Sequence, residues 1–201
     1  MAMSRIGCGV ALAWTLGVCA ALATPAVAGG GAADEPVYRG VIVSGADITQ
    51  NADEAYTGAY YAFNGDLSRE GFILRLFGTR GFYDYNVAGT QFDANYWQGD
   101  AMIGYQWVRG STDIAVYVGV DYQDHKITPD DPANKLRGSD VGFKVGLDIE
   151  SNDRRASGIY YALNGSYSTA FDSYYALARV GRTFGRFTVG PEGWVLGDES
   201  G

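Results

Sequence analysis

His125 is the one histidine in this 201-residue chain, and chemistry at this position is the first hypothesis to weigh. Hydrolysis and acyl transfer both need a base beside a nucleophile. His125 as base, Ser139 as nucleophile and Asp124 as the acid could together form a catalytic group. Their spacing in the sequence matches no known catalytic motif. A lone histidine in a loop is usually only solvated. We therefore expect a protein that is not an enzyme.

The segment 129–132 (PDDP) is the next candidate, because calcium prefers oxygen ligands. Two acids between prolines more often form a rigid turn. The glycines match no phosphate-binding loop. Both cysteines, Cys8 and Cys19, lie in the first 28 residues, which leaves no thiolate ligands in the rest of the chain. We expect no catalytic residue, metal or other cofactor.

Tyrosines and carboxylates are mixed along several stretches, and together they can bind sugars. Aromatic rings stack on the apolar faces of sugars, and carboxylates accept hydrogen bonds from sugar hydroxyls. Against this, aromatic residues in barrels mostly form girdles or fill the lumen. The candidate lumen-facing or sugar-facing residues are Asp100, Tyr117, Asp121, Lys144, Asp148 and Tyr160.

The elements that must position these residues are strands. Over 140–150, Val141, Phe143 and Val145 alternate with polar or small residues, and the same pattern recurs at 97–107, 112–124 and 158–167. Less regular runs occupy 37–47, 56–64, 71–84, 174–184 and 186–196. No stretch after Ala28 sustains a helical apolar stripe. Nine strands are predicted, each long enough to cross a bilayer at a tilt.

The polar face of these strands distinguishes a membrane barrel from a soluble β-fold such as a lipocalin-like barrel or a sandwich. A water-exposed face should carry many Lys, Glu and Thr residues, whereas this one carries small residues, Tyr and isolated charges, as in a narrow barrel interior. The apolar face has aromatic residues near strand ends, as interfacial girdles do. These are Phe72, Trp97, Trp107, Tyr122 and Tyr167. We predict an all-β, antiparallel, up-and-down transmembrane barrel.

The predicted connections alternate in length. Those at 65–70, 109–111, 151–156 and 185–186 are short, and those at 48–55, 85–94 and 125–138 are longer. Short periplasmic turns and long external loops are typical of bacterial outer-membrane barrels. The connection at 169–173 is short where a long one is expected.

Residues 1–28 have the features of a cleaved secretory signal peptide: Arg5, an apolar run over 9–23 and small residues up to Ala28. The alternative is a lipoprotein signal ending at Cys19, but Val18 precedes that cysteine where a small residue is normal. Residues 29–201 then form a single domain. Loss of Arg5 takes the net charge from −8 to −9, and so acidic a chain does not suit nucleic-acid binding.

Several runs resemble the cellulose biosynthesis protein BcsS of alphaproteobacteria, over essentially the whole chain from the predicted cleavage site to Glu192. They are 64–72 (NGDLSREGF), 99–110 (GDAMIGYQWVRG), 129–132, 137–138, 141–144 (VGFK), 166–174 (SYSTAFDSY) and 184–192 (FGRFTVGPE). The resemblance implies a place in a cellulose secretion system. Its partners would be outer-membrane lipid, the glucan chain and other cellulose-synthesis components.

The resemblance also implies further strands after Glu192, whereas this chain stops at Gly201. We expect a barrel that is short at its C-terminus, because bacterial barrels have even strand numbers and an open edge in lipid leaves backbone groups unsatisfied. The hypothesis is a non-enzymatic outer-membrane accessory that aids glucan export or surface anchoring through the loops 85–94 and 125–138. The alternatives are a glucan-conducting channel and an outer-membrane hydrolase or acyltransferase near His125.

Overall fold

The computed structural model describes residues 22–23, 37–48, 52–151, 158–184 and 187–198. The predicted signal peptide, 1–28, lies outside the described residues except for Leu22–Ala23, which form the two-residue strand β1.

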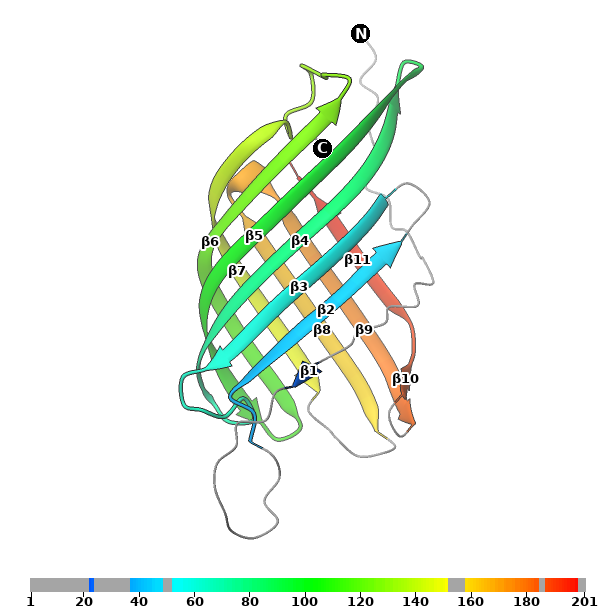
Figure 1. The fold of residues 1–201 in the computed structure, drawn as a ribbon. Coiled ribbons are helices and arrows are strands. Elements are labelled where there is room, and N and C mark those ends of the chain that lie inside the picture. The colour runs from blue at the N-terminus through cyan, green and yellow to red at the C-terminus, as the bar shows by residue number, and fades with distance from the viewer. Residues whose placement is uncertain (1–21, 24–36, 49–51, 152–157, 185–186, 199–201) are drawn as a thin grey trace.

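The described chain is an antiparallel meander in which each strand pairs with the next (Figure 1). Alternation of apolar and polar residues is what a sheet with two different faces requires. The strands after β1 are β2 (Gly40–Ile48), β3 (Ala52–Ala62), β4 (Gly71–Val87), β5 (Thr90–Arg109), β6 (Thr112–Thr128), β7 (Gly138–Ser151), β8 (Ile159–Ser168), β9 (Tyr174–Phe184), β10 (Phe187–Val189) and β11 (Glu192–Gly197).

A 3-10 turn, η1 (Ala170–Asp172), joins β8 to β9. None of the described segments is a helix with the length and apolar character needed to span a membrane.

The sheet curls into a half-barrel rather than a closed barrel (Figure 1). β2 forms one edge and pairs with β1 over two residues, while β10 and β11 share the other edge and both pair with β9. The predicted ninth strand, 186–196, is thus interrupted at Gly190 and Pro191. The all-β, antiparallel, up-and-down fold class is confirmed.

The prediction of a long loop at 85–94 is wrong. β4 and β5 pair continuously from Gly71↔Gln106 to Val87↔Thr90, so the segment is the tip of a β-hairpin. Its turn is Ala88-Gly89 with φ of 51° and 86°, and the Asn86 side chain accepts a hydrogen bond from the Gly89 amide at 3.0 Å. An alanine with positive φ is not a turn signal that sequence provides, because turns of this kind favour Asn-Gly or Asp-Gly.

The other two predicted loops are shorter than expected. β2 ends at Ile48 and β3 begins at Ala52, and β6 continues to Thr128 before the connection 129–137. This connection lies at the same end of the sheet as the β4–β5 hairpin tip, which is the upper end in Figure 1. The connections 63–70 and 110–111 lie at the lower end.

Gly119 allows β5 and β6 to approach closely at the centre of the sheet. A Cβ atom there would lie 2.2 Å from the Ala101 carbonyl oxygen and 2.6 Å from the Met102 Cα atom. We expect Gly119→Ala to lower the free energy of unfolding by about 1–3 kcal/mol, because backbone atoms must move to admit the methyl group. Urea unfolding followed by tryptophan fluorescence measures this loss.

Gly193→Ala is the matched control, because a Cβ atom at Gly193 would have no heavy atom within 4 Å. We expect a change within about 0.5 kcal/mol, because the added methyl group would meet no other atom at this half-buried strand position. Equal losses in the two variants would contradict the close approach at Gly119.

Candidate functional site

The convex face of the half-barrel is apolar and exposed. Its central strands present, among others, Leu76, Ile103, Val118, Val120, Val141 and Phe143. Aromatic pairs lie at both ends of this apolar belt: Phe72 and Tyr105, with ring centroids 5.1 Å apart, at the lower end and Trp97 and Tyr122, 4.7 Å apart, at the upper end. The predicted apolar faces of β5, β6 and β7 are therefore confirmed as the outer face.

The concave face carries a buried ion network. Lys144 Nζ lies 2.7 Å from Asp100 Oδ2 and 3.7 Å from Asp121 Oδ1, and Arg75 Nη1 lies 3.5 Å from Asp100 Oδ1. Two cations and two carboxylates balance, which lets four charged groups be buried together. The sequence analysis predicted Asp100, Asp121 and Lys144 as lumen-facing residues. It did not predict Arg75, because the alternation along β4 was too irregular for its two faces to be assigned.

Two glutamines extend the network toward the upper end. The Gln98 amide donates to Asp121 at 3.0 Å, and the Gln123 amide donates to Asp121 at 2.8 Å and to Ser173 Oγ at 2.7 Å. Asp121 is thereby fully hydrogen-bonded, as a buried carboxylate must be. The network holds β5 and β6 to the β8–β9 connection.

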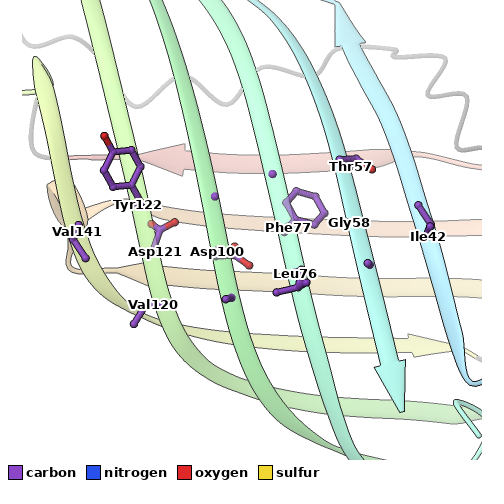
Figure 2. Close-up of a pocket in the computed structure, with 14 residues that line it drawn as sticks. Ile42, Thr57, Gly58, Leu76, Phe77, Asp100, Val120, Asp121, Tyr122 and Val141 are labelled. Carbon is purple, nitrogen blue, oxygen red and sulfur yellow. The ribbon is translucent and has the colours of Figure 1, made fainter. Parts of the chain in front are cut away.

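A hollow of about 530 Å³ lies over β2–β7, where Gly78 and Gly99 leave space between larger side chains (Figure 2). Exposed apolar residues of the convex face, including Leu76 and Val120, line it. Asp100 and Asp121 also contribute to the lining, but their side chains belong to the concave ion network. The hollow is therefore mainly a feature of the apolar outer face.

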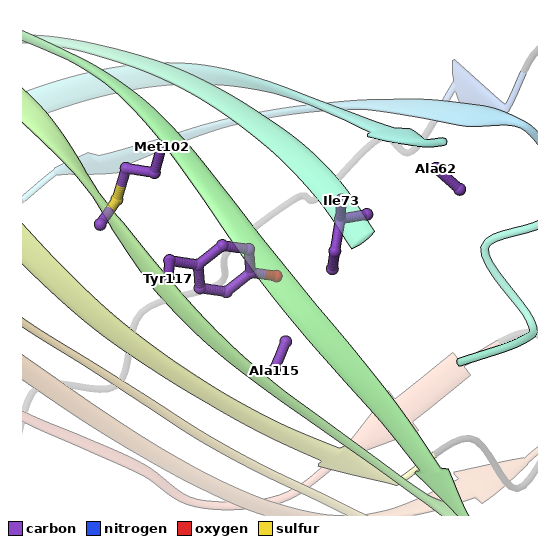
Figure 3. Packing of buried hydrophobic residues seen from close by; sticks show 5 residues of the cluster. All are labelled: Ala62, Ile73, Met102, Ala115 and Tyr117. Carbon is purple, nitrogen blue, oxygen red and sulfur yellow. The ribbon is translucent and has the colours of Figure 1, made fainter. Parts of the chain in front are cut away.

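The lower part of the concave face is a dry cluster. Met102, Tyr117, Ile73, Ala115 and Ala62 pack together there (Figure 3). The 63–70 connection folds against this cluster through Leu67, whose backbone carbonyl accepts a hydrogen bond from the Gln106 amide at 2.8 Å. In the described part of the chain, this stretch of the interior is thus filled by the protein's own side chains.

The six predicted lumen-facing residues all lie on the concave side, but they do not form one continuous track. Asp100, Asp121 and Lys144 share the ion network, and Tyr117 is part of the dry cluster. Asp148 accepts from the Asn164 amide at 2.8 Å, and the Tyr160 hydroxyl donates to Glu150 at 2.9 Å. All six are held by other side chains of the protein.

A row of aromatic rings, which we call the aromatic row, occupies the upper part of the concave face. Neighbouring ring centroids are 5.0 to 6.2 Å apart. In spatial order the rings are Phe92, Tyr85, Tyr83, Tyr96, His125 and Phe171. The sequence analysis missed this row because it placed 85–94 in a loop. The alternation of Tyr83 with Tyr85 and of Phe92 with Ala94 was the available signal.

His125 is not the solvated loop residue that we expected. It lies in β6, is only 8% exposed, and stacks on Tyr96 with 5.3 Å between ring centroids. Burial lowers the pKa of His125, so the ring is neutral at pH 7. Asp124 and Ser139, the residues that completed the proposed catalytic set, are paired with each other across β6 and β7. Asp124 points to the opposite face from His125, so the set is not brought together.

Two polar atoms of the aromatic row have no hydrogen-bond partner among the described residues: the Tyr83 hydroxyl and His125 Nδ1. Burial raises the pKa of Tyr83 to about 12, so its hydroxyl stays protonated and able to donate. Buried polar atoms are nearly always bonded to protein, water or ligand. Both atoms are themselves buried, so their unmet hydrogen bonds are a local energetic cost of packing the aromatic row.

The acids of the segment 129–132 are engaged by neighbouring side chains. Asp131 accepts a hydrogen bond from the Tyr85 hydroxyl at 2.9 Å, and Asp130 pairs with Arg137 at 3.1 Å. Asn134 also donates to the Tyr85 hydroxyl, at 2.9 Å. The segment is a structured connection tied to the β4–β5 hairpin. No cluster of three or more potential metal ligands occurs within the ranges that the structure describes.

The fold and its two faces define a class of protein: an up-and-down antiparallel half-barrel with an apolar exterior and a polar, charge-balanced interior. The family described as cellulose biosynthesis protein BcsS matches residues 41–201, and the chain belongs to that family. The family name places the protein in cellulose biosynthesis, in association with the cellulose synthesis machinery. Comparisons with curated proteins and with solved structures found no match.

Proposed function

We propose that this protein is exported to the bacterial outer membrane, where it aids cellulose secretion or anchoring without catalysing a reaction. The exposed apolar belt on the convex face, bounded by aromatic pairs at both ends, is the observation that carries the proposal. Such a belt is costly in water and is favoured against lipid. Family membership supplies the pathway.

The upper end of the sheet supports a role in contacts outside the membrane. β4 and β5 contain 17 and 20 residues, whereas about 9–11 suffice to cross a bilayer. Beyond Trp97 the outward positions of β5 are polar, as at Asn95 and Asp93, and on β4 only Phe82, opposite Asn95, is a large exposed apolar residue before the tip at Val87. The hairpin therefore projects past the apolar belt, and the bonds from Tyr85 to Asp131 and Asn134 join it to the 129–137 connection.

A glucan-conducting channel is the second candidate, and the interior argues against it. The dry cluster and the ion network occupy successive levels of the concave face and are held by internal contacts. A chain passing along this face would have to displace buried, mutually paired charges. An accessory role at the upper end requires no such displacement. It does require that the two sheet edges be paired when the sheet lies in lipid.

Fractionation of cellulose in a host lacking its own member of the family tests this function. The wild-type gene should restore normal surface cellulose. A shortened hairpin, with Asn-Gly replacing residues 84–93, joins Tyr83 directly to its register partner Ala94 and should give at least a several-fold loss of surface cellulose. Ala88→Asn, which suits the positive φ of the turn and keeps the hairpin length, should behave as wild type.

The compartment in which cellulose accumulates distinguishes a role in secretion from a role in surface anchoring. Material trapped in the periplasm identifies a part in the exit route, and material shed into the medium identifies surface anchoring. Protein level in outer-membrane fractions is measured in parallel. Normal surface cellulose in the host that lacks the gene, or in a host with the shortened hairpin, would overturn the proposal.

A further inference from the structure

We propose that the hollow on the convex face binds a phosphate-bearing membrane lipid, with an acyl chain over Gly78 and Gly99 and the phosphate on Arg80. The inference rests on the proposed function, because insertion of the convex face in the membrane is what brings lipid to the hollow. The hollow measures about 530 Å³ and is open at the surface of the sheet (Figure 2). This size is typical of pockets that hold small ligands.

The floor of the hollow is open because two glycines lie side by side on it. Gly78 on β4 is the register partner of Gly99 on β5. A Cβ atom at Gly78 would lie 3.9 Å from its nearest heavy atom, and one at Gly99 would lie 3.5 Å from the Trp97 ring. Neither position needs glycine for a close approach or for a positive φ. An acyl chain lying there would gain dispersion contacts that the sheet's own side chains do not supply.

Larger apolar side chains border this floor. Leu76 and Val120 are exposed on its lower side and line the hollow. The upper aromatic pair borders it above, because Tyr122 is the register partner of Gly99 and the Trp97 ring reaches toward the same glycine. A channel between aromatic rings and aliphatic side chains favours a hydrocarbon chain over a polar ligand.

Arg80 places a cation at the upper rim of the hollow. It lies on β4 two residues above Gly78, on the same face of the sheet, and is the register partner of Trp97. Its side chain is exposed, and the guanidinium carbon lies 5.5 Å from the centroid of the Phe82 ring. Within the described ranges Arg80 forms no ion pair. The guanidinium is therefore available to a ligand.

The level of Arg80 is the level at which a lipid headgroup lies, because aromatic girdles such as that at Trp97 mark the membrane interface. A guanidinium can bind two phosphate oxygens at once, and its aliphatic stem can lie along apolar surface. Asp53 and Asp124 on the flanking strands balance Arg80 and Lys126 in charge. Recognition therefore depends on contact between the phosphate and Arg80 rather than on a positive field over the whole rim.

Quenching of Trp97 fluorescence by lipids with brominated acyl chains tests the site. Trp107→Phe and Trp194→Phe leave Trp97 as the one tryptophan after the predicted signal peptide. This reporter protein is purified in neutral maltoside micelles. Brominated phosphatidylglycerol should quench Trp97 at a half-saturating amount about fivefold lower than brominated diacylglycerol, which lacks the phosphate.

Two variants of the reporter protein separate the headgroup from the chain. Arg80→Gln should bring the two lipids to within about twofold of each other, because it removes the phosphate contact and leaves the floor unchanged. Gly78→Leu fills the floor without a backbone clash and should raise the half-saturating amount of both lipids about fivefold.

Arg182→Gln and Gly165→Leu are the matched controls. Arg182 is also an exposed arginine, 5.6 Å from the Phe184 ring centroid, but it lies at the lower end of the sheet (Figure 1). Gly165 lies on the convex face of β8, where a Cβ atom would be 3.7 Å from its nearest heavy atom. Both variants should leave quenching of Trp97 within about twofold of the unsubstituted reporter.

The inference is overturned if neither lipid quenches Trp97, if both quench it equally, or if Arg80→Gln and Arg182→Gln have equal effects. If the lipid preference is absent but the wild-type gene restores surface cellulose, the lipid site fails and the proposed function stands. If the preference is present but the host exports and retains cellulose without the gene, the lipid site stands and the proposed function fails.

Discussion

Replacing Val118 by arginine should lower the free energy of unfolding of the vesicle-inserted protein by about 2–4 kcal/mol. This is the cost of placing a cation near the bilayer midplane. Val118 lies on the convex face, 43% exposed, opposite Ile103 on β5 and Val145 on β7. It lies between the aromatic pairs that bound the apolar belt, two residues from Val116, the register partner of Tyr105, and four from Tyr122. Urea unfolding in the presence of vesicles, followed by tryptophan fluorescence, measures the change.

Val141→Arg is the control for depth. Val141 is 68% exposed on the same face but lies opposite Tyr122, at the level of the upper aromatic pair. A cation at this level should cost only about 0–1 kcal/mol. If the convex face were exposed to water, neither substitution would cost much, and similar small changes in both variants would contradict insertion of this face in lipid.

Lys144→Met should lower the free energy of unfolding by about 3–5 kcal/mol, because removing one partner of a buried ion pair leaves a buried charge uncompensated. The Lys144 side chain is 7% exposed, and Asp100 and Asp121 are almost completely buried beside it. Arg75, at 3.5 Å from Asp100, is then the one remaining cation in the network. Denaturant unfolding of the purified protein tests this value.

The double variant Lys144→Met, Asp121→Asn separates charge balance from packing. It restores neutrality, with Arg75 paired to Asp100, and should recover a substantial part of the lost stability. Arg109→Met removes the exposed pair with Glu70, at 2.7 Å, and should cost less than about 1 kcal/mol. A double variant no more stable than Lys144→Met alone would argue that the network acts through shape rather than charge.

The sequence by itself determined the strands and their faces. Side chains alternate along a strand, so a regular run such as Val141, Phe143 and Val145 identifies one face without knowledge of the neighbouring strands. The same alternation predicted that Asp100, Asp121 and Lys144 lie on the face opposite the apolar one. In the structure all three are buried on the concave face. Local pattern is enough for these decisions because each depends only on the chain within a few residues.

Only the tertiary structure decided which of these residues meet. Lys144 contacts Asp100 through strand pairing across β5, β6 and β7, and Arg75 joins them from β4, where irregular alternation hid its direction. The hairpin tip was predicted as a loop because its two-residue turn begins with Ala88, where turns of this kind usually have Asn or Asp.

The aromatic row was likewise invisible before folding. Its six rings come from β4, β5, β6 and the β8–β9 connection. Residues such as Tyr83 and His125 are 42 positions apart in the numbering. Cross-strand register brings them to one level, and register is set by the pairing of whole strands rather than by any residue's own neighbours. That is why the sequence predicted a polar interior, and why the structure was needed to show which interior residues lie together.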